Sequence, residues 1–181
     1  MRAAIMVAKR GIGRSGVNPP VGCVLIGAGG QLLASGHTGA GGVPHAESAA
    51  LASLDDAGRV ALQGGTAYVT LEPCAHHGKT PPCADALITA RVARVVVACG
   101  DPDARVAVRG IARLRDAGIE VETDFCHAAA ADINVGFLTR VGEGRPMVAL
   151  KTATTSDGRI ATRTGDSQWI TGAAARRHAH L

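Results

Sequence analysis

The sequence concentrates its most informative residues in two short stretches, Pro44-His-Ala-Glu47 and Glu72-Pro-Cys-Ala-His-His-Gly-Lys-Thr-Pro-Pro-Cys83. They contain one histidine and two cysteines, His45, Cys74 and Cys83, and these residue types bind Zn²⁺. Three protein ligands leave the fourth position of a tetrahedral ion for water, an arrangement typical of catalytic zinc sites. The pattern therefore predicts a catalytic metal centre in a fold that brings the three side chains together.

An acidic residue accompanies these expected ligands. Glu47 lies two residues after His45, at the start of an expected helix, and can face the metal without ligating it. Because zinc lowers the pKa of its water toward neutrality, such a carboxylate can take a proton from that water and pass it on. Two alternatives remain: His76 or His77 as a fourth ligand would make the site structural, and Glu47 alone could be a carboxylate favoured by the helix dipole.

The spacing matches a deaminase signature in its first half only. Zinc deaminases carry H-x-E followed by P-C-x-x-C; residues 45–47 and 73–74 fit, but eight residues separate Cys74 from Cys83. The intervening loop must fold back to bring the second cysteine to the metal. Three polar residues of that loop form a set suited to a phosphate group: His76, Lys79 and Thr80.

Composition narrows the function classes. The chain has 181 residues, of which 46% are hydrophobic and 2% aromatic. So few aromatics argue against a module that stacks nucleic-acid bases. A net charge of +4 from scattered basic residues suits an anionic small molecule. No apolar run is long enough to span a membrane and the N-terminus does not resemble a signal peptide, so we expect a cytoplasmic protein.

Hydrophobic periodicity predicts an α/β fold, with helices on both faces of one mixed sheet. Strands are expected over 21–26, 32–36, 66–71, 92–99 and 119–123, the first two as a hairpin. Helices are expected over 2–10, 45–54, 83–90, 106–117 and 126–141. The remaining cysteines, Cys23, Cys99 and Cys126, are expected as core thiols.

A boundary is expected at 142–146, which gives a zinc-dependent domain over 1–143 and the truncated start of a second domain over 144–181. The 36 residues beyond 145 are fewer than an independent domain needs. Within them we expect a strand over 147–151 and a helix from Gly172.

Several motifs together resemble a known family. They are Val17-Asn-Pro-Pro-Val-Gly-Cys-Val24, the two stretches quoted first, and Asn134-Val-Gly-Phe-Leu138. They look like the deaminase domain of the bifunctional riboflavin-biosynthesis deaminase/reductase. The tail, with Gly165-Asp-Ser-Gln-Trp-Ile-Thr171, looks like the opening of the reductase domain.

The resemblance implies a cytidine-deaminase-like three-layer α/β/α sandwich. It implies hydrolytic deamination of 2,5-diamino-6-ribosylamino-4(3H)-pyrimidinone 5′-phosphate, with Zn²⁺ on His45, Cys74 and Cys83 and Glu47 as proton shuttle. NADPH would serve only the largely missing reductase half. Position by position it also suggests substrate contacts at Asn18, His76, Lys79, Thr80 and Ser167, and cofactor contacts at Ala153 and Trp169.

Departures and rivals accompany this interpretation. Val108 stands where the family usually has Gly, and Asp103 where it usually has Asn. Asn18 before a proline is also a turn former.

Two rival functions remain. One is a zinc deaminase of another nucleoside, base or nucleic acid; the second is a zinc-stabilised module without catalysis. The expected partner is a small phosphorylated pyrimidine, with no nucleic acid and no membrane, and association into a homo-oligomer is left open.

Overall fold

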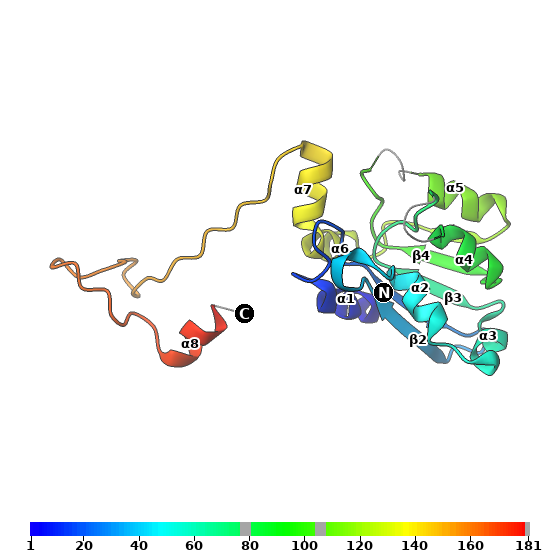
Figure 1. Cartoon of the computed structure of the whole chain (residues 1–181), viewed down its shortest axis with the longest axis horizontal. Coiled ribbons are helices and arrows are strands. Elements are labelled where there is room, and N and C mark those ends of the chain that lie inside the picture. The colour runs from blue at the N-terminus through cyan, green and yellow to red at the C-terminus, as the bar shows by residue number, and fades with distance from the viewer. Residues whose placement is uncertain (77–80, 104–107, 180–181) are drawn as a thin grey trace. The chain divides into compact units, whose positions relative to one another are not determined.

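The computed structural model describes residues 1–76, 81–103 and 108–179. The chain divides into two compact units, Met1–Pro146 and Met147–Leu181, and each is described by itself. The first unit is built around a five-stranded sheet of order β2-β1-β3-β4-β5 (Figure 1). The strands are β1 (Gly22–Ile26), β2 (Leu32–His37), β3 (Thr66–Val69), β4 (Arg94–Val97) and β5 (Glu120–Glu122).

The sheet is mixed, as the sequence predicted. β1 pairs antiparallel with both β2 and β3, whereas β3, β4 and β5 run parallel to one another. Val95, Val96 and Val97 of β4 are at most 1% exposed, as expected for a central parallel strand covered on both faces. The fold is thus an α/β fold with the opening hairpin at one edge.

Helices cover both faces of this sheet. On one face α2 (Ala46–Ala52) packs beside α4 (Cys83–Thr89), and α4 packs beside α5 (Arg109–Asp116). On the other face α1 (Arg2–Ala8) lies beside α6 (His127–Ile133). Two glycines mark the opposite faces: a Cβ on Gly22 would lie 2.0 Å from the Ala4 carbonyl, and one on Gly36 would lie 2.4 Å from that of Ala46. Both helices therefore approach the strands backbone to backbone.

The core consists of small aliphatic side chains, as the scarcity of aromatics requires. The larger cluster lies between the sheet and the helices α2 and α4, and it includes Cys23, Leu25, Ala50, Val69, Leu87 and Leu114. A smaller cluster on the α1 and α6 face contains Leu71, Ala98, Cys99 and Ala130. Cys126, expected in the core, is exposed, because it lies at the N-terminal end of α6 with a left-handed backbone.

One predicted helix is divided in two, and one helix of the structure was not predicted. Residues 126–141 form two helices, α6 and α7 (Val135–Glu143), which meet at Asn134. The Asn134 side chain is buried and donates to the Ala130 carbonyl at 3.2 Å, a local bond of the kind that competes with a continuous helix. The helix α3 (Asp56–Leu62) was not predicted; it is capped by Asp55, whose Oδ1 accepts from the Gly58 N–H at 2.7 Å.

The second unit has little regular structure. Its described residues contain the short helix α8 (Ala173–His178) and no strand. The prediction of a strand over 147–151 was therefore wrong; a strand needs a neighbour to pair with, and the described part of this unit offers none. Arg176 lies over the Trp169 ring, 4.1 Å from its centroid. No helix among the described residues is long and apolar enough to cross a membrane.

Val108 carries backbone strain that glycine would remove. It precedes α5 at φ 64°, in the left-handed region, where a β-branched residue is disfavoured by about 1–2 kcal/mol. We expect Val108→Gly to stabilise the protein by about 1 kcal/mol, which corresponds to a rise in Tm of about 3 °C for a chain of this size. Thermal unfolding measures the change.

The matched control is Val60→Gly in α3, where the exposed valine has an ordinary helical neighbourhood. That substitution should destabilise the protein by about 0.5 kcal/mol. Equal losses of stability in both variants would contradict the assignment of strain to residue 108.

Candidate active site

A cavity of about 160 Å³ opens among the loop before β1, the N-terminus of α2 and the segments that follow β3 and β4. It gathers most of the residues that the sequence singled out in the first unit. Its lining includes Asn18, His45, Glu47, Cys74 and His76, together with Thr38, Glu72, Asp101, Asp103 and Phe137. Segments separated by more than 50 residues of chain thus share one cavity.

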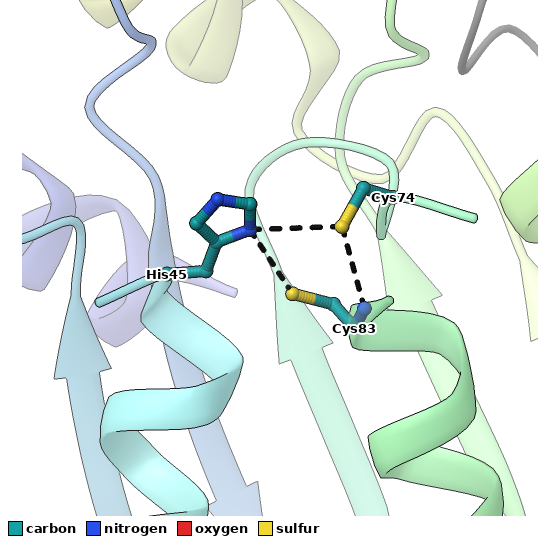
Figure 2. A group of neighbouring side chains, drawn as sticks. All are labelled: His45, Cys74 and Cys83. Carbon is teal, nitrogen blue, oxygen red and sulfur yellow. Dashed lines mark hydrogen bonds between the residues drawn. The ribbon is translucent and has the colours of Figure 1, made fainter. Parts of the chain in front are cut away.

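His45, Cys74 and Cys83 point toward one another, as Figure 2 shows. The His45 Nδ1 lies 3.3 Å from the Cys83 Sγ and 3.6 Å from the Cys74 Sγ. All three candidate ligand atoms lie within 4.8 Å of one another. With Zn–N near 2.0 Å and Zn–S near 2.3 Å, a nitrogen and a sulfur on one tetrahedral ion are about 3.5 Å apart. The side chains present therefore fit a zinc ion.

Helix starts set this geometry. His45 is the N-cap of α2, with extended backbone angles (φ −68°, ψ 155°) that turn its side chain away from the helix. Cys83 is the first residue of α4, directly after Pro82. The Cys83 N–H donates to the Cys74 Sγ at 3.3 Å, and the Ala84 N–H donates to the Cys74 carbonyl at 3.1 Å. The backbone at Cys74 is thereby fastened to the first turn of α4.

The electrostatics favour a thiolate at Cys74. The pKa of this thiol is lowered to about 4, first because Cys83 donates a hydrogen bond to it, with further contributions from His45 and from the Cys83 backbone. The pKa of Cys83 is raised, since Cys74 holds its proton in place and burial disfavours a second negative charge. The hydrogen bond with Cys74 raises the pKa of His45. The thiolate is the form of cysteine that binds metals.

Glu47 lies in the first turn of α2 and is 3% exposed. Burial raises the pKa of its carboxyl group to about 7. A group with this pKa is present in both protonation states near neutral pH, which suits a residue that must both accept and donate a proton.

The predicted substrate contacts have different outcomes. Asn18 lines the cavity, and its Nδ2 donates to the Ser15 and Gly41 carbonyls at 3.1 Å each. His76 also lines the cavity, and its buried Nδ1 has no hydrogen-bond partner among the described residues. Lys79 and Thr80 lie outside the described residues.

The expected reductase contacts lie in the second unit. Ala153 is half-buried, whereas Ser167 and Trp169 are exposed. Their roles stay predictions, because this unit is described by itself.

Three acidic residues also line the cavity, and sequence reasoning missed two of them, Glu72 and Asp101, whereas Asp103 was noted as a departure from the family pattern. Asp101 and Asp103 follow β4, and their position was itself a signal, since ligands in parallel α/β sheets bind beyond the carboxyl ends of the strands. Glu72 lies in the second of the two stretches quoted first, directly before Pro73, where the prediction rested on the candidate metal ligands.

Comparison with known proteins decides the family. Residues 1–99 match the cytidine and deoxycytidylate deaminase zinc-binding region. The chain belongs to this deaminase family. Residues 146–181 match a second family, the RibD C-terminal domain.

Relatives over the whole chain point the same way. The chain is 48% identical over 181 residues to the riboflavin biosynthesis protein RibD of Escherichia coli (strain K12), covering 100% of this chain and 48% of that protein. Identity to the RibD of Aquifex aeolicus is 44% over 181 residues, covering 100% of this chain and 49% of that protein. The resemblance stated from the motifs is thereby confirmed. The chain spans about half the length of these curated relatives.

A solved structure confirms the fold. It is the diaminohydroxyphosphoribosylaminopyrimidine deaminase/5-amino-6-(5-phosphoribosylamino)uracil reductase of Thermotoga maritima, with a TM-score of 0.91 and 43% identity. The match covers 99% of this chain and 50% of that one. The cytidine-deaminase-like α/β architecture is therefore the fold of this chain.

Asp101 makes stability depend on pH. The pKa of this carboxyl group is raised from 3.8 to about 6, and burial is the largest cause. Because its ionised form is disfavoured in the folded protein, stability declines as the pH rises from about 3.8 to about 6. Asp101→Asn should remove this decline, since the amide oxygen can still accept from the Asp103 N–H.

We expect Asp101→Asn to add about 1 kcal/mol of stability above pH 7 and nothing near pH 3.5, the gain being reduced by partial exposure of the group. Urea unfolding of both proteins across this pH range measures the difference. A gain of the same size at both ends of the range would contradict the titration of Asp101.

Proposed function

We propose that this chain is the deaminase of riboflavin biosynthesis. The reaction is hydrolytic deamination of 2,5-diamino-6-ribosylamino-4(3H)-pyrimidinone 5′-phosphate to 5-amino-6-(5-phosphoribosylamino)uracil and ammonia. The observation that carries the proposal is the close approach of His45, Cys74 and Cys83 beside a cavity that the buried Glu47 also lines. Identity of 48% to a riboflavin biosynthesis protein over all 181 residues supports the choice of pathway.

His45, Cys74 and Cys83 would hold Zn²⁺ through one nitrogen and two sulfurs. A zinc ion held by three protein ligands supplies a water that is a nucleophile at neutral pH. Cys74 enters the site already biased toward its thiolate, so metal binding displaces fewer protons.

Glu47 would move the protons. Its carboxylate form accepts a proton from the attacking water, and its acid form donates to the ring nitrogen and then to the departing amine. Water adds its oxygen to the amine-bearing ring carbon, the carbon–nitrogen bond breaks, and ammonia leaves. The pKa of about 7 keeps both forms of Glu47 accessible, which supports this double role.

The remaining predicted residues would bind substrate. With its Nδ2 occupied by two carbonyls, Asn18 keeps Oδ1 available as an acceptor for the amine and ring N–H groups of the substrate. His76 offers a ring nitrogen, Nδ1, at the cavity that has no hydrogen-bond partner in the part of the chain that the structure describes. Lys79 and Thr80, in the loop between the two cysteines, would bind the phosphate.

In a full-length chain the second unit would begin the NADPH-dependent reductase, with Ser167 at its substrate and Ala153 and Trp169 at its cofactor. Because the chain spans about half of its relatives, we expect no reductase turnover from these 181 residues. The enzyme's cytoplasmic location likewise stays a prediction.

Ammonia release from the phosphorylated diaminopyrimidine, by protein loaded with zinc or treated with a chelator, tests the function. We expect release with zinc and its loss with the chelator, restored when zinc is added back. Cytidine, deoxycytidine monophosphate, adenosine and a tRNA anticodon stem serve as competing substrates. Turnover of one of these instead would favour a deaminase of another nucleoside or base. Zinc binding without turnover of any of them would favour a zinc-stabilised module.

Glu47→Gln tests the proton shuttle separately from the metal. The amide keeps the size of the side chain but cannot accept the proton, so we expect zinc content to be unchanged and kcat to fall by at least about 100-fold. Atomic absorption and ammonia release measure the two quantities. Glu120→Gln, which alters an exposed carboxylate that pairs with Arg94, is the matched control and should leave both unchanged. Full activity of the Glu47 variant would rule out the assigned role.

A further inference from the structure

Glu72 is a buried carboxylate that the proposed chemistry does not use. It is 5% exposed and lies two residues before Cys74. Its Oε1 accepts from the backbone N–H groups of Gly110 at 3.0 Å and Ile111 at 3.3 Å. Its Oε2 accepts from those of Val108 at 3.1 Å and Asp101 at 3.5 Å. Four backbone donors thus converge on one side chain.

Two of these donors, Gly110 and Ile111, lie in the first turn of α5, and the other two lie near the ends of the segment that joins β4 to α5. Asp101 stands near its start and lines the cavity, whereas Val108 and Gly110 stand at its end, at the first turn of α5. Bonds to charged acceptors are stronger than bonds between neutral groups, and a carboxylate at a helix N-terminus also gains from the helix dipole. Glu72 therefore holds both ends of this segment at once.

The first turn of α5 is pressed against the backbone of Pro73, the residue before Cys74. A Cβ on Gly110 would lie 1.8 Å from the Pro73 carbonyl oxygen, so only glycine allows this approach. Val108, next to it, keeps a left-handed backbone at φ 64° that its side chain disfavours. Such a conformation persists only where its surroundings enforce it, and the bond from the Val108 N–H to Glu72 is a contact that does so.

We propose that Glu72 is a positioning residue for substrate binding, which places the Asp101 side chain at the cavity wall by tying the β4–α5 segment to the strand end that carries Cys74. This inference rests on the proposed deaminase function. Glu72 itself touches no reacting atom in this scheme, because both of its oxygens are occupied by backbone N–H groups.

Glu72→Gln separates positioning from metal binding and from catalysis. The amide replaces one acceptor oxygen by an NH₂ group, which loses two acceptor contacts and faces two N–H donors. We expect KM for the phosphorylated diaminopyrimidine to rise at least tenfold, with kcat within threefold of the unaltered protein and one zinc per chain. Glu72→Asp, a milder change that keeps the charge, should raise KM less, and it serves if the Gln variant does not fold.

Glycine at residue 108 provides a rescue. The left-handed backbone costs glycine nothing, so the double variant Glu72→Gln/Val108→Gly should hold the segment better than Glu72→Gln does. We expect its KM to exceed that of Val108→Gly alone by a smaller factor than Glu72→Gln exceeds the unaltered protein. A merely stabilising role for Glu72 predicts instead that KM follows Tm in every variant.

Two control variants address stability. Asp55→Ala removes a comparable carboxylate-to-backbone contact at the start of α3, and Asp85→Asn removes the ion pair of α4 with Arg113 of α5. Both should lower Tm and leave KM unchanged. A rise in KM for either control as large as that for Glu72→Gln would overturn the proposal. So would an unchanged KM, or a loss of zinc, in the Glu72 variants.

Amide hydrogen exchange gives a readout that does not need turnover. Glu72→Gln should accelerate exchange at least tenfold at residues 108, 110 and 111, and leave the amides of α2 unchanged. If the unaltered, zinc-loaded protein releases no ammonia, the proposed function fails and exchange still decides whether Glu72 holds the segment. Unchanged exchange at these three amides would overturn that part as well.

Discussion

Everything at the cavity depends on three segments meeting at one point, namely the N-cap of α2, the chain after β3 and the first turn of α4. The candidate metal-binding atoms that they carry lie within 4.8 Å of one another although His45 and Cys83 are 38 residues apart. Zinc tolerates little error in these separations, since its bonds have nearly fixed lengths. The sheet and its helices therefore act as a scaffold, and the bonds from Cys83 and Ala84 to Cys74 fix the last part of the alignment.

Burial governs the charges around this point. The same loss of water raises the pKa values of both Glu47 and Asp101, which lie on different elements of one cavity. The pKa of Cys74 is lowered instead, because hydrogen bonds from its neighbours outweigh the effect of burial. The cavity therefore resists additional negative charge near the metal ligands. A neutral heterocycle suits the inner part of such a cavity better than an anionic phosphate does.

The sequence predicted the strands of the sheet and most of the helices that cover it, and it singled out the three candidate metal ligands, because each had a local signal: apolar runs, 3.6-residue spacing or a ligand pattern. Other features did not follow from such local patterns. The break at Asn134 depends on a side chain that bonds back to the carbonyl of its own helix. The helix α3 begins at Asp55, a capping residue that is followed by a second aspartate and so is not distinctive in the sequence. The apolar run over 147–151 predicted a strand, but the described residues of its unit contain no strand with which it could pair. Glu72 acts through contacts between distant segments, and such contacts leave no mark on local spacing.

The close approach of α2 to the β1–β2 hairpin affects the position of His45 as well as the packing of the core. Gly36 lies directly against the backbone of Ala46, the residue after His45. Even one methyl group there must displace the start of α2, and the imidazole moves with it. We therefore expect metal affinity to depend partly on Gly36, a residue that offers no ligand atom. Screens for zinc-deficient variants should accordingly recover changes on β2 as well as at the ligands.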